Sequence, residues 1–262
     1  MSDLSDSLAQ SWRLIPYWDG PGHIQMTMDD WLLRQFVQGL GKPTLRFYGW
    51  QPAAISLGYF QKSYPEHWPT LTWEDQLLSI VRRPSGGRAV LHQGSLTYAV
   101  ICDQGQGKRW QAYERICQFL IAGWQQLGIP LQYGTAQRGY IHNASCFNTA
   151  TAADLVALDG SKLIGSAQRQ CGHAILQHGS MVLNSDHLLF EQVFQQLAPW
   201  KKTLSDRLGE ISLPEILTVL TEKACQCFDI NLITQPLTPE EWQSIYQHQN
   251  CLELPPSKSS YL

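Results

Sequence analysis

The residue best suited to covalent chemistry is Cys146, which lies in a loop rich in asparagine, serine and threonine, outside any periodic apolar stripe. A thiolate is a strong nucleophile, and a neighbouring ammonium group stabilises it. The turn pair Asp159-Gly160 predicts a hairpin that folds Lys162 back beside residues 154–158, toward the Cys146 loop. We therefore expect Cys146 as nucleophile and Lys162 as its stabilising cation. The alternatives are a partly buried thiol without chemistry and a solvated charge at a strand end.

A second stretch, from Arg82 to His92, contains two arginines, a proline, a serine and two adjacent glycines before an apolar run. The order predicts a strand, a sharp cationic loop and a second strand. Adjacent glycines let backbone N–H groups approach a ligand, and arginines bind anionic or carbonyl oxygens. The alternative is a tight hairpin turn with two surface arginines.

Other reactive residue types form no recognisable site. His92, His173 and His178 lie at predicted strand ends, where a hydrogen-bonded structural or pocket role is more probable than metal binding. Cys225 and Cys227 lack metal-site spacing, and a G-x-S-x-G elbow and a Walker loop are both absent. The sequence therefore predicts no metal.

Hydrophobic periodicity indicates how these residues are positioned. A helix is expected from an N-cap at Thr27, with Asp29 and Asp30 in its first turn, to a stop at Gly41. Strand-like runs follow at 44–48, 53–58, 77–83, 88–92 and 95–102. The last two are expected to form a hairpin around Gln93-Gly94.

The second half begins with a helix predicted at 108–127, whose buried stripe includes Cys117. The hairpin at Asp159-Gly160 and a strand at 173–183 come next. Helices then follow, two of them opened by capping boxes at Ser212 and Thr238. These elements predict an α/β (α+β) fold, a mixed and largely antiparallel sheet flanked by helices.

Composition limits the classes of function. The chain has 262 residues, which suits a single domain with a core at about 27–200 and a helical C-terminal part at about 200–254. A net charge of −3 gives no case for nucleic acid or an anionic membrane as partner. Seven scattered cysteines favour reduced thiols, and residues 1–10 do not read as a secretory signal. We expect a cytoplasmic protein.

The stretch Arg82 to His92, followed by Leu96-Thr97-Tyr98, resembles the signature loop of the lipoate–protein ligase and octanoyltransferase superfamily. Blocks at 28–29, 45–48, 55–61, 160–169 and 175–180 fit the same pattern, so the resemblance covers roughly residues 27 to 183. It implies a fold shared with biotin–protein ligases and acyl transfer to the lysine of a lipoyl domain. The superfamily includes ligases that activate lipoate with ATP and transferases that move an octanoyl group through a cysteine thioester.

Two features favour the transferase chemistry. Cys146-Phe147 resembles the Cys-Phe of the octanoyltransferase branch that carries its nucleophile in this loop. Arg88 stands where many ligases have a third glycine, and His92-Gln93 lacks the aspartate that often follows the histidine.

The sequence thus predicts an octanoyltransferase that takes its acyl group from acyl carrier protein. Its acceptor would be a lipoyl-domain protein such as glycine cleavage H protein or a 2-oxoacid dehydrogenase E2. Neither ATP nor a metal is expected. Cys146 and Lys162 are the predicted catalytic residues, and the predicted substrate-binding residues are Arg82, Arg83, Ser85, Gly86, Gly87, His92, Gly165, Ser166, Ala167, His178 and Gly179. Alternatives are an ATP-dependent ligase, an amidotransferase between lipoyl domains and a non-catalytic binding module.

Overall fold

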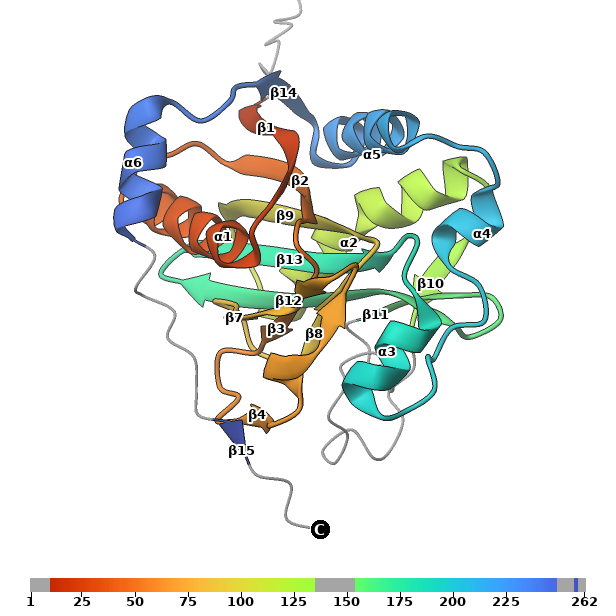
Figure 1. Ribbon diagram of the computed structural model, residues 1–262. Helices are drawn as coiled ribbons and strands as arrows, with labels where there is room; N and C mark the ends of the chain where they lie inside the picture. Colours follow the sequence, from red (N-terminus) through yellow and green to blue (C-terminus); the bar gives the residue numbers. More distant parts are fainter. Residues whose placement is uncertain (1–9, 135–153, 249–256, 259–262) are drawn as a thin grey trace, which may run out of the picture.

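An eight-stranded sheet forms the centre of the molecule in the computed structural model, which describes residues 10–134, 154–248 and 257–258 (Figure 1). In spatial order the strands are β10 (Leu131–Tyr133), β11 (Asp154–Ala157), β12 (Lys162–Cys171), β13 (Ala174–Val182), β9 (Ser95–Asp103), β2 (Thr44–Trp50), β1 (Gln10–Gly20) and β14 (Ile230–Thr234). Pairing is antiparallel from β10 to β2, whereas β1 runs parallel to both β2 and β14. The predicted mixed, largely antiparallel sheet is confirmed.

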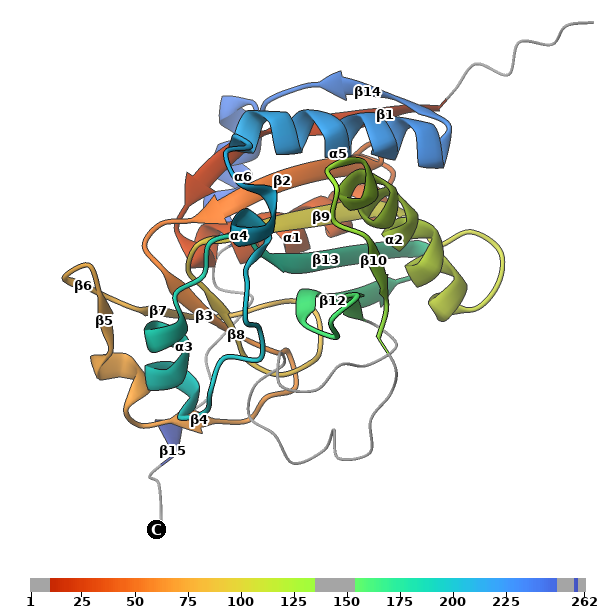
Figure 2. The same ribbon diagram turned by 90° about the vertical axis from the view of Figure 1, so that its right-hand side faces the viewer.

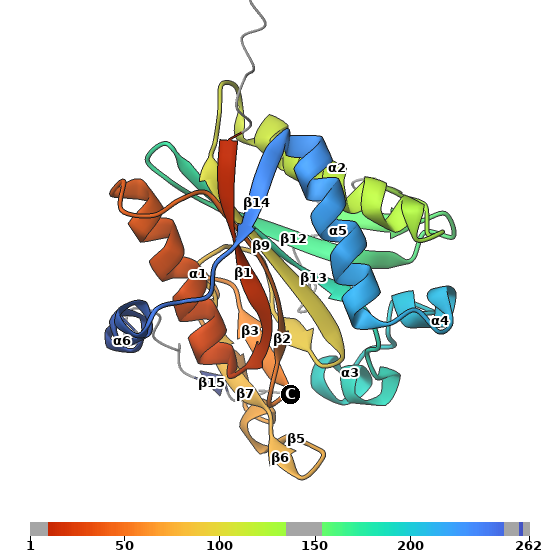
Figure 3. The same cartoon turned by 90° about the horizontal axis from the view of Figure 1, so that it is seen from above.

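Helices cover both faces of this sheet, as the view from above shows (Figure 3). Helices α1 (Gly22–Val37) and α6 (Pro239–Gln247) pack on one face, and α2 (Arg109–Gln126) and α5 (Leu213–Phe228) pack on the other. The predicted stripe of α2 is buried, and Cys117 on it is fully covered. Two apolar cores result, one on each side of the sheet.

A smaller sheet extends the molecule on the α1 side. Its strands are β7 (Ser79–Arg82), β3 (Ala54–Leu57) and β8 (Val90–His92), with β3 in the middle. Helix α3 (His187–Phe194) packs against it in a third apolar core. The remaining elements are short: β4 (Tyr64–Pro65), the 3-10 helix η1 (Trp68–Thr70), β5 (Thr72–Trp73), β6 (Gln76–Leu77), α4 (Leu204–Leu208) and β15 (Ser257–Lys258) (Figure 2).

The hairpin predicted around Gln93-Gly94 is wrong. Strand β8 pairs with β3 in the small sheet, whereas β9 pairs with β2 and β13 in the large one. Gln93-Gly94 instead connects the small sheet to the large one. Hydrogen bonds from the segment that follows β13 fix this connection. The Gly94 carbonyl accepts the Asn184 N–H at 2.6 Å, and the Gln93 side-chain oxygen accepts the Asp186 N–H at 2.7 Å. Gly94 has φ of +56°, so it turns the chain without a Cβ penalty.

Helix α1 begins at Gly22, before the predicted N-cap at Thr27. Its N-cap is Pro21, whose fixed φ of −59° favours a helix start directly after β1. Consequently Asp29 and Asp30 lie within the helix rather than in its first turn, and both side chains are buried. They are internal charges that need partners inside the protein.

Of the sequence predictions for the second half of the chain, some are confirmed and one is wrong. The β11–β12 hairpin is present, and Lys162 pairs in register with Val156 across it. The capping boxes at Ser212 and Thr238 open α5 and α6 as predicted. Strand β14, however, lies within the part predicted to be helical. Among the described residues no helix has the length and apolarity needed to cross a bilayer.

A partly buried ion pair joins β1 to α6. The Arg13 guanidinium on β1 contacts the Glu241 carboxylate on α6 at 2.7 Å, across 228 residues of sequence. The same guanidinium donates to the carbonyls of Gln235 and Pro236. These bonds fix the segment that leads from β14 to α6 against the first strand.

Candidate active site

A narrow, mainly apolar pocket lies between α1, the small sheet and strands β12 and β13. The free space between its side chains is about 380 Å³, including the open mouth, a size typical of small-molecule sites. The apolar side chains that line it include Met26, Tyr48, Trp50 and Val90. Such a lining suits a chain of methylene groups better than a charged ligand.

Seven of the predicted substrate-binding residues line this pocket: Arg83, His92, Gly165, Ser166, Ala167, His178 and Gly179. Gly179 has no room for a side chain, because a Cβ there would lie 2.5 Å from Ser166 Oγ and 2.7 Å from Tyr98 Cε1. The close approach of β12 and β13 at this point therefore requires glycine. Arg82, Ser85, Gly86 and Gly87 lie in the adjoining segment rather than in the wall itself.

The two arginines of the signature loop bind backbone carbonyls of the protein itself. Arg83 donates to the carbonyls of Ser56, Gly86 and Arg88 at 2.7 to 3.0 Å, and it is 5% exposed. Arg82 donates to three carbonyls in the segment after β3, at residues 58, 59 and 61. We predicted both arginines as substrate-binding residues, but these hydrogen bonds direct their donors to backbone carbonyls of the loop. Their contribution is to shape the loop from within.

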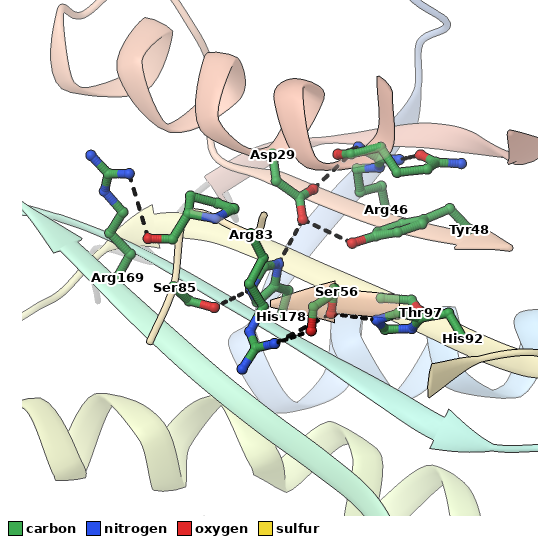
Figure 4. Close-up of polar contacts among 12 residues, drawn as sticks. Asp29, Arg46, Tyr48, Ser56, Arg83, Ser85, His92, Thr97, Arg169 and His178 are labelled. Atoms are coloured by element: carbon green, nitrogen blue, oxygen red, sulfur yellow. Dashed lines mark hydrogen bonds and ion pairs between the residues drawn. The ribbon is translucent and has the colours of Figure 1, made fainter. Parts of the chain in front are cut away.

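Asp29, missed as a functional residue by the sequence analysis, is the centre of a buried polar network beside the pocket (Figure 4). Its Oδ2 accepts hydrogen bonds from Tyr48 Oη at 2.8 Å and His178 Nδ1 at 2.7 Å, and its Oδ1 pairs with Arg46 at 3.2 Å. His178 Nε2 lies 2.5 Å from Ser85 Oγ. The chain of contacts thus joins helix α1, strand β13 and the signature loop.

The Asp29 side chain is completely buried, and its partners account for its charge. Arg46, which also contacts Gln25 and lies over the Tyr48 ring, supplies the opposite charge. Burial, and then the negative charge of Asp29, raise the pKa of Tyr48 well above its ordinary value, so the phenol keeps its proton and donates. The available sequence signal was the position of Asp29 on a buried apolar helix face, in a block that matched the superfamily pattern.

A second histidine, His92, closes the pocket on the side of the small sheet. The Trp50 ring stacks on the imidazole with centroids 3.7 Å apart, and Trp50 Nε1 donates to Thr97 Oγ1 at 2.8 Å. His92 Nε2 lies 2.8 Å from Ser56 Oγ. Burial, followed by the positive charge of Arg83, lowers the pKa of His92 well below its ordinary value. This histidine is therefore a neutral wall residue rather than a cation that attracts anions.

Lys162 lies beside the pocket rather than in its wall. Its Nζ is 2.9 Å from Oδ1 of Asp154, and both side chains are 3% exposed. Asp154 stands opposite Gly165 in the β11–β12 register, and Gly165 belongs to the pocket wall. The hairpin thus brings Lys162 back to the segment that begins with Asp154, as predicted. Cys146 lies outside the described residues, so its predicted contact with Lys162 stays a prediction.

The described cysteines differ in how deeply they are buried. Burial raises the pKa of Cys117 to about 12 and that of Cys102 to about 11, which makes both poor nucleophiles at neutral pH. Cys171, Cys225 and Cys227 are partly exposed and free. Within the ranges that the structure describes, no cluster of three or more His, Cys, Asp or Glu side chains is arranged to hold a metal.

With this geometry in hand, comparison with known proteins decides the family. The model of the lipoyl protein ligase A/B catalytic domain matches residues 21–236. The chain belongs to this family. The match includes the strands of the large sheet other than β1, the small sheet and the residues that line the pocket.

Curated relatives of this family member are named octanoyltransferases. The chain is 36% identical to octanoyltransferase LipM of Moorella thermoacetica over 189 residues, covering 69% of this chain and 68% of the relative. It is 31% identical to LipM of Carboxydothermus hydrogenoformans over 249 residues, covering 88% and 92%.

Solved structures confirm the ligase-like fold. A lipoate-protein ligase A bound with ATP has a TM-score of 0.76 at 19% identity, covering 92% of this chain and 95% of that one. A structure from a study of the bipartite lipoate protein ligase of Thermoplasma acidophilum and its E2 lipoyl domain has a TM-score of 0.73 at 18% identity, with 93% of each chain covered. At these identities the likeness establishes the fold alone.

Proposed function

We propose that this protein transfers an octanoyl (or lipoyl) group from acyl carrier protein to the lysine of a lipoyl domain through a thioester on Cys146. The observation that carries the proposal is the apolar pocket whose β12 wall lies next to the buried Lys162–Asp154 pair. An acyl chain matches the pocket lining, and an ammonium group near its edge matches thiolate chemistry. The names of the curated relatives support the same acyl group.

In the proposed first step the Cys146 thiolate attacks the carbonyl carbon of the octanoyl thioester. A C–S bond to Cys146 forms, the bond to the carrier's phosphopantetheine sulfur breaks, and the released thiolate takes up a proton. Lys162, as the ammonium ion, stabilises the Cys146 thiolate before the attack. Asp154 holds the ammonium group in place.

In the second step the lysine amine of the lipoyl domain attacks the acyl-enzyme, forming an amide and releasing Cys146. Exchange of one thioester for another is close to neutral in free energy, and conversion of a thioester to an amide is downhill. The proposed reaction therefore needs neither ATP nor a metal.

Mass spectrometry tests this proposal directly. The protein is incubated with octanoyl-carrier protein, and an octanoyl increment removable by hydroxylamine is expected. Cys146→Ala should abolish the increment, whereas Cys171→Ala, the same change at a partly exposed cysteine of β12, should retain it. An adduct that persists on Cys146→Ala would refute the thioester mechanism.

A donor panel separates the alternative reactions. Octanoyl-carrier protein, an octanoylated lipoyl domain, and free octanoate or lipoate with ATP are offered separately to the same acceptor domain. Strict dependence on ATP together with an active Cys146→Ala variant would establish a ligase instead. Preference for the octanoylated lipoyl domain would establish an amidotransferase, and binding without turnover would establish a non-catalytic module.

Alkylation kinetics test the role of Lys162. If its ammonium stabilises the thiolate, Lys162→Ala should move the pH dependence of Cys146 alkylation to higher pH and slow acylation at neutral pH. An unchanged pH profile would remove Lys162 from the mechanism while leaving the nucleophile in place.

A further inference from the structure

Phe60 is the most exposed of the large apolar residues that the structure describes, at 81%, and it lies in the turn that connects β3 to β4. Its neighbour Tyr59 is 43% exposed, and the two rings are in edge contact with centroids 5.1 Å apart. A Cβ built on Gly86 would have the Phe60 ring as its nearest neighbour, at 3.8 Å. Two aromatic rings are therefore exposed beside the glycines of the signature loop.

The turn that carries these rings is held in place by the signature loop. Arg82 donates to three of its carbonyls, at residues 58, 59 and 61, over 2.5 to 3.1 Å. The Tyr59 N–H donates to the Ser85 carbonyl at 2.8 Å, and the Gln61 N–H donates to the Gly58 carbonyl at 2.9 Å. Because the backbone is already fixed, a partner that contacts the rings loses little affinity to their ordering.

The turn also lies next to the mouth of the acyl pocket. Arg169 of β12 lies over the Tyr59 ring at 5.4 Å, pairs with Asp30 at 2.9 Å and donates to the Pro84 carbonyl at 3.5 Å (Figure 4). The pocket-wall residue Ala167 is two positions earlier on the same strand. Side chains two positions apart share a face, so Arg169 lies about 7 Å from the wall along β12.

The edge of this aromatic surface is cationic. Lys62 is exposed at the end of the turn, and the Arg169 side chain is 26% exposed. The one buried carboxylate here, Asp30, pairs with both Arg34 and Arg169, so it cannot neutralise both arginines. Glu66, the exposed acidic residue of this segment, lies beyond β4. An apolar surface with positive charges at its edge suits a partner that carries an anion.

We propose that Tyr59, Phe60, Lys62 and Arg169 form the docking surface for the carrier protein that donates the acyl group. The phosphodiester of its phosphopantetheine arm would face the two cations, and its protein surface would contact the rings. This inference rests on the proposed function and names where its donor binds. The lipoyl domain is the weaker candidate, because the lysine ammonium that it presents in water would meet charges of the same sign.

Two donors with the same thioester test the role of Phe60. Octanoyl-carrier protein has the protein and the phosphodiester, whereas octanoyl-pantetheine has neither. Phe60→Ala should raise the concentration of octanoyl-carrier protein needed for half-maximal acylation by about 10-fold or more, at an unchanged maximal rate. Acylation by octanoyl-pantetheine should keep its concentration dependence. An equal loss with both donors would show that Phe60 supports the pocket itself, and the proposal would be wrong.

A third donor, octanoyl-phosphopantetheine, tests the two cations because it has the phosphate without the protein. Arg169→Gln and Lys62→Gln should each weaken acylation by this donor and by octanoyl-carrier protein, but not by octanoyl-pantetheine. Lys62 is exposed, so its substitution carries little risk to the fold. If both variants treated the phosphorylated and unphosphorylated small donors alike, the assignment of the phosphodiester to this surface would fail.

Leu197→Ala is the matched control, because Leu197 is 79% exposed and lies between α3 and α4, outside the proposed surface. It should behave as the unaltered protein with all three donors. A loss with octanoyl-carrier protein equal to that of Phe60→Ala would show that any exposed apolar residue has this effect, and the docking surface would be refuted.

Calorimetric titration with unacylated carrier protein separates docking from chemistry. Phe60→Ala should bind the carrier protein more weakly than the unaltered full-length protein does. Weaker binding of a lipoyl domain, with carrier-protein binding unchanged, would assign the surface to the acceptor and overturn the proposal. An unaltered protein that binds carrier protein but forms no acyl-enzyme would instead refute the proposed function and leave the docking surface in place.

Discussion

The Nζ of Lys162 lies 2.9 Å from Oδ1 of Asp154, and this ion pair is almost completely shielded from water. The pair bridges two strands joined by a tight turn, so it fixes the hairpin that forms one edge of the site. Charges buried in this way depend on each other, because removal of one leaves the other without compensation.

Asp154→Asn should therefore destabilise the protein by about 3 kcal/mol. Asp159→Asn, in the same hairpin, is the control. Asp159 pairs with Arg207 at 2.8 Å but is 47% exposed, so its loss should cost less than about 1 kcal/mol. Urea denaturation of the three proteins measures the difference, and equal midpoints for the two variants would contradict the prediction.

Arg83→Lys should loosen the signature loop even though the charge is kept. A lysine ammonium cannot contact the carbonyls of Ser56, Gly86 and Arg88 in the geometry of the planar guanidinium. We expect a loss of about 1–3 kcal/mol from unsatisfied buried carbonyls, together with faster amide hydrogen exchange in residues 84–90. Arg207→Lys serves as the control, and unchanged exchange in Arg83→Lys would disprove this role.

Gly58→Ala should disrupt the contact between the end of β3 and the signature loop. A Cβ at Gly58 would lie 1.8 Å from the Gly87 carbonyl oxygen, whereas a Cβ at Gly86 would lie 3.8 Å from its nearest neighbour, Phe60. The first variant should cost about 1–3 kcal/mol and the second little. Thermal unfolding of both proteins checks this, and a stable Gly58→Ala variant would show that the loop moves aside.

Asp30 should contribute to acid unfolding. Burial alone would raise its pKa, but hydrogen bonds from His248 and Arg34 and the charge of Arg169 outweigh burial and lower it. A carboxyl with a depressed folded-state pKa stabilises the protein above its unfolded value of 3.8, and this stabilisation is lost as the pH falls through the folded-state pKa. The stability difference between the unaltered protein and Asp30→Asn should thus shrink as the pH falls below 3.8. If the stability difference between the two proteins stayed constant down to the pH of acid unfolding, the prediction would be wrong.

Local signals in the sequence were sufficient for much of the fold. The β11–β12 hairpin, helix α2 and the two capping boxes depend on turn residues and periodicity within short segments, and all were predicted. The pairing of β8 with β3 was not, because Gln93-Gly94 has the composition of a hairpin turn while partners far along the chain use its hydrogen-bonding groups.

Some residues of the candidate site were likewise predicted from the sequence, and others were not. The glycines and His178 of the pocket wall were found through their resemblance to the superfamily pattern. Asp29 was missed because the predicted N-cap at Thr27 placed it in the first turn of the helix, where the helix dipole explains an acidic residue. Only the true helix start at Gly22 shows that this carboxylate points into the protein.

The pairing of β1 with β14 has a consequence for how the chain folds during synthesis. Strand β1 cannot complete its hydrogen bonding until residues 230–234, which are synthesised much later, reach the same edge of the sheet. Until then the outer edge of β1 remains open, and such edges attract strands from other molecules. The ion pair from Arg13 to Glu241 forms later still. Folding of the sheet therefore depends on synthesis of residues 230–234, and a nascent protein stalled before residue 230 would depend on chaperones for protection of β1.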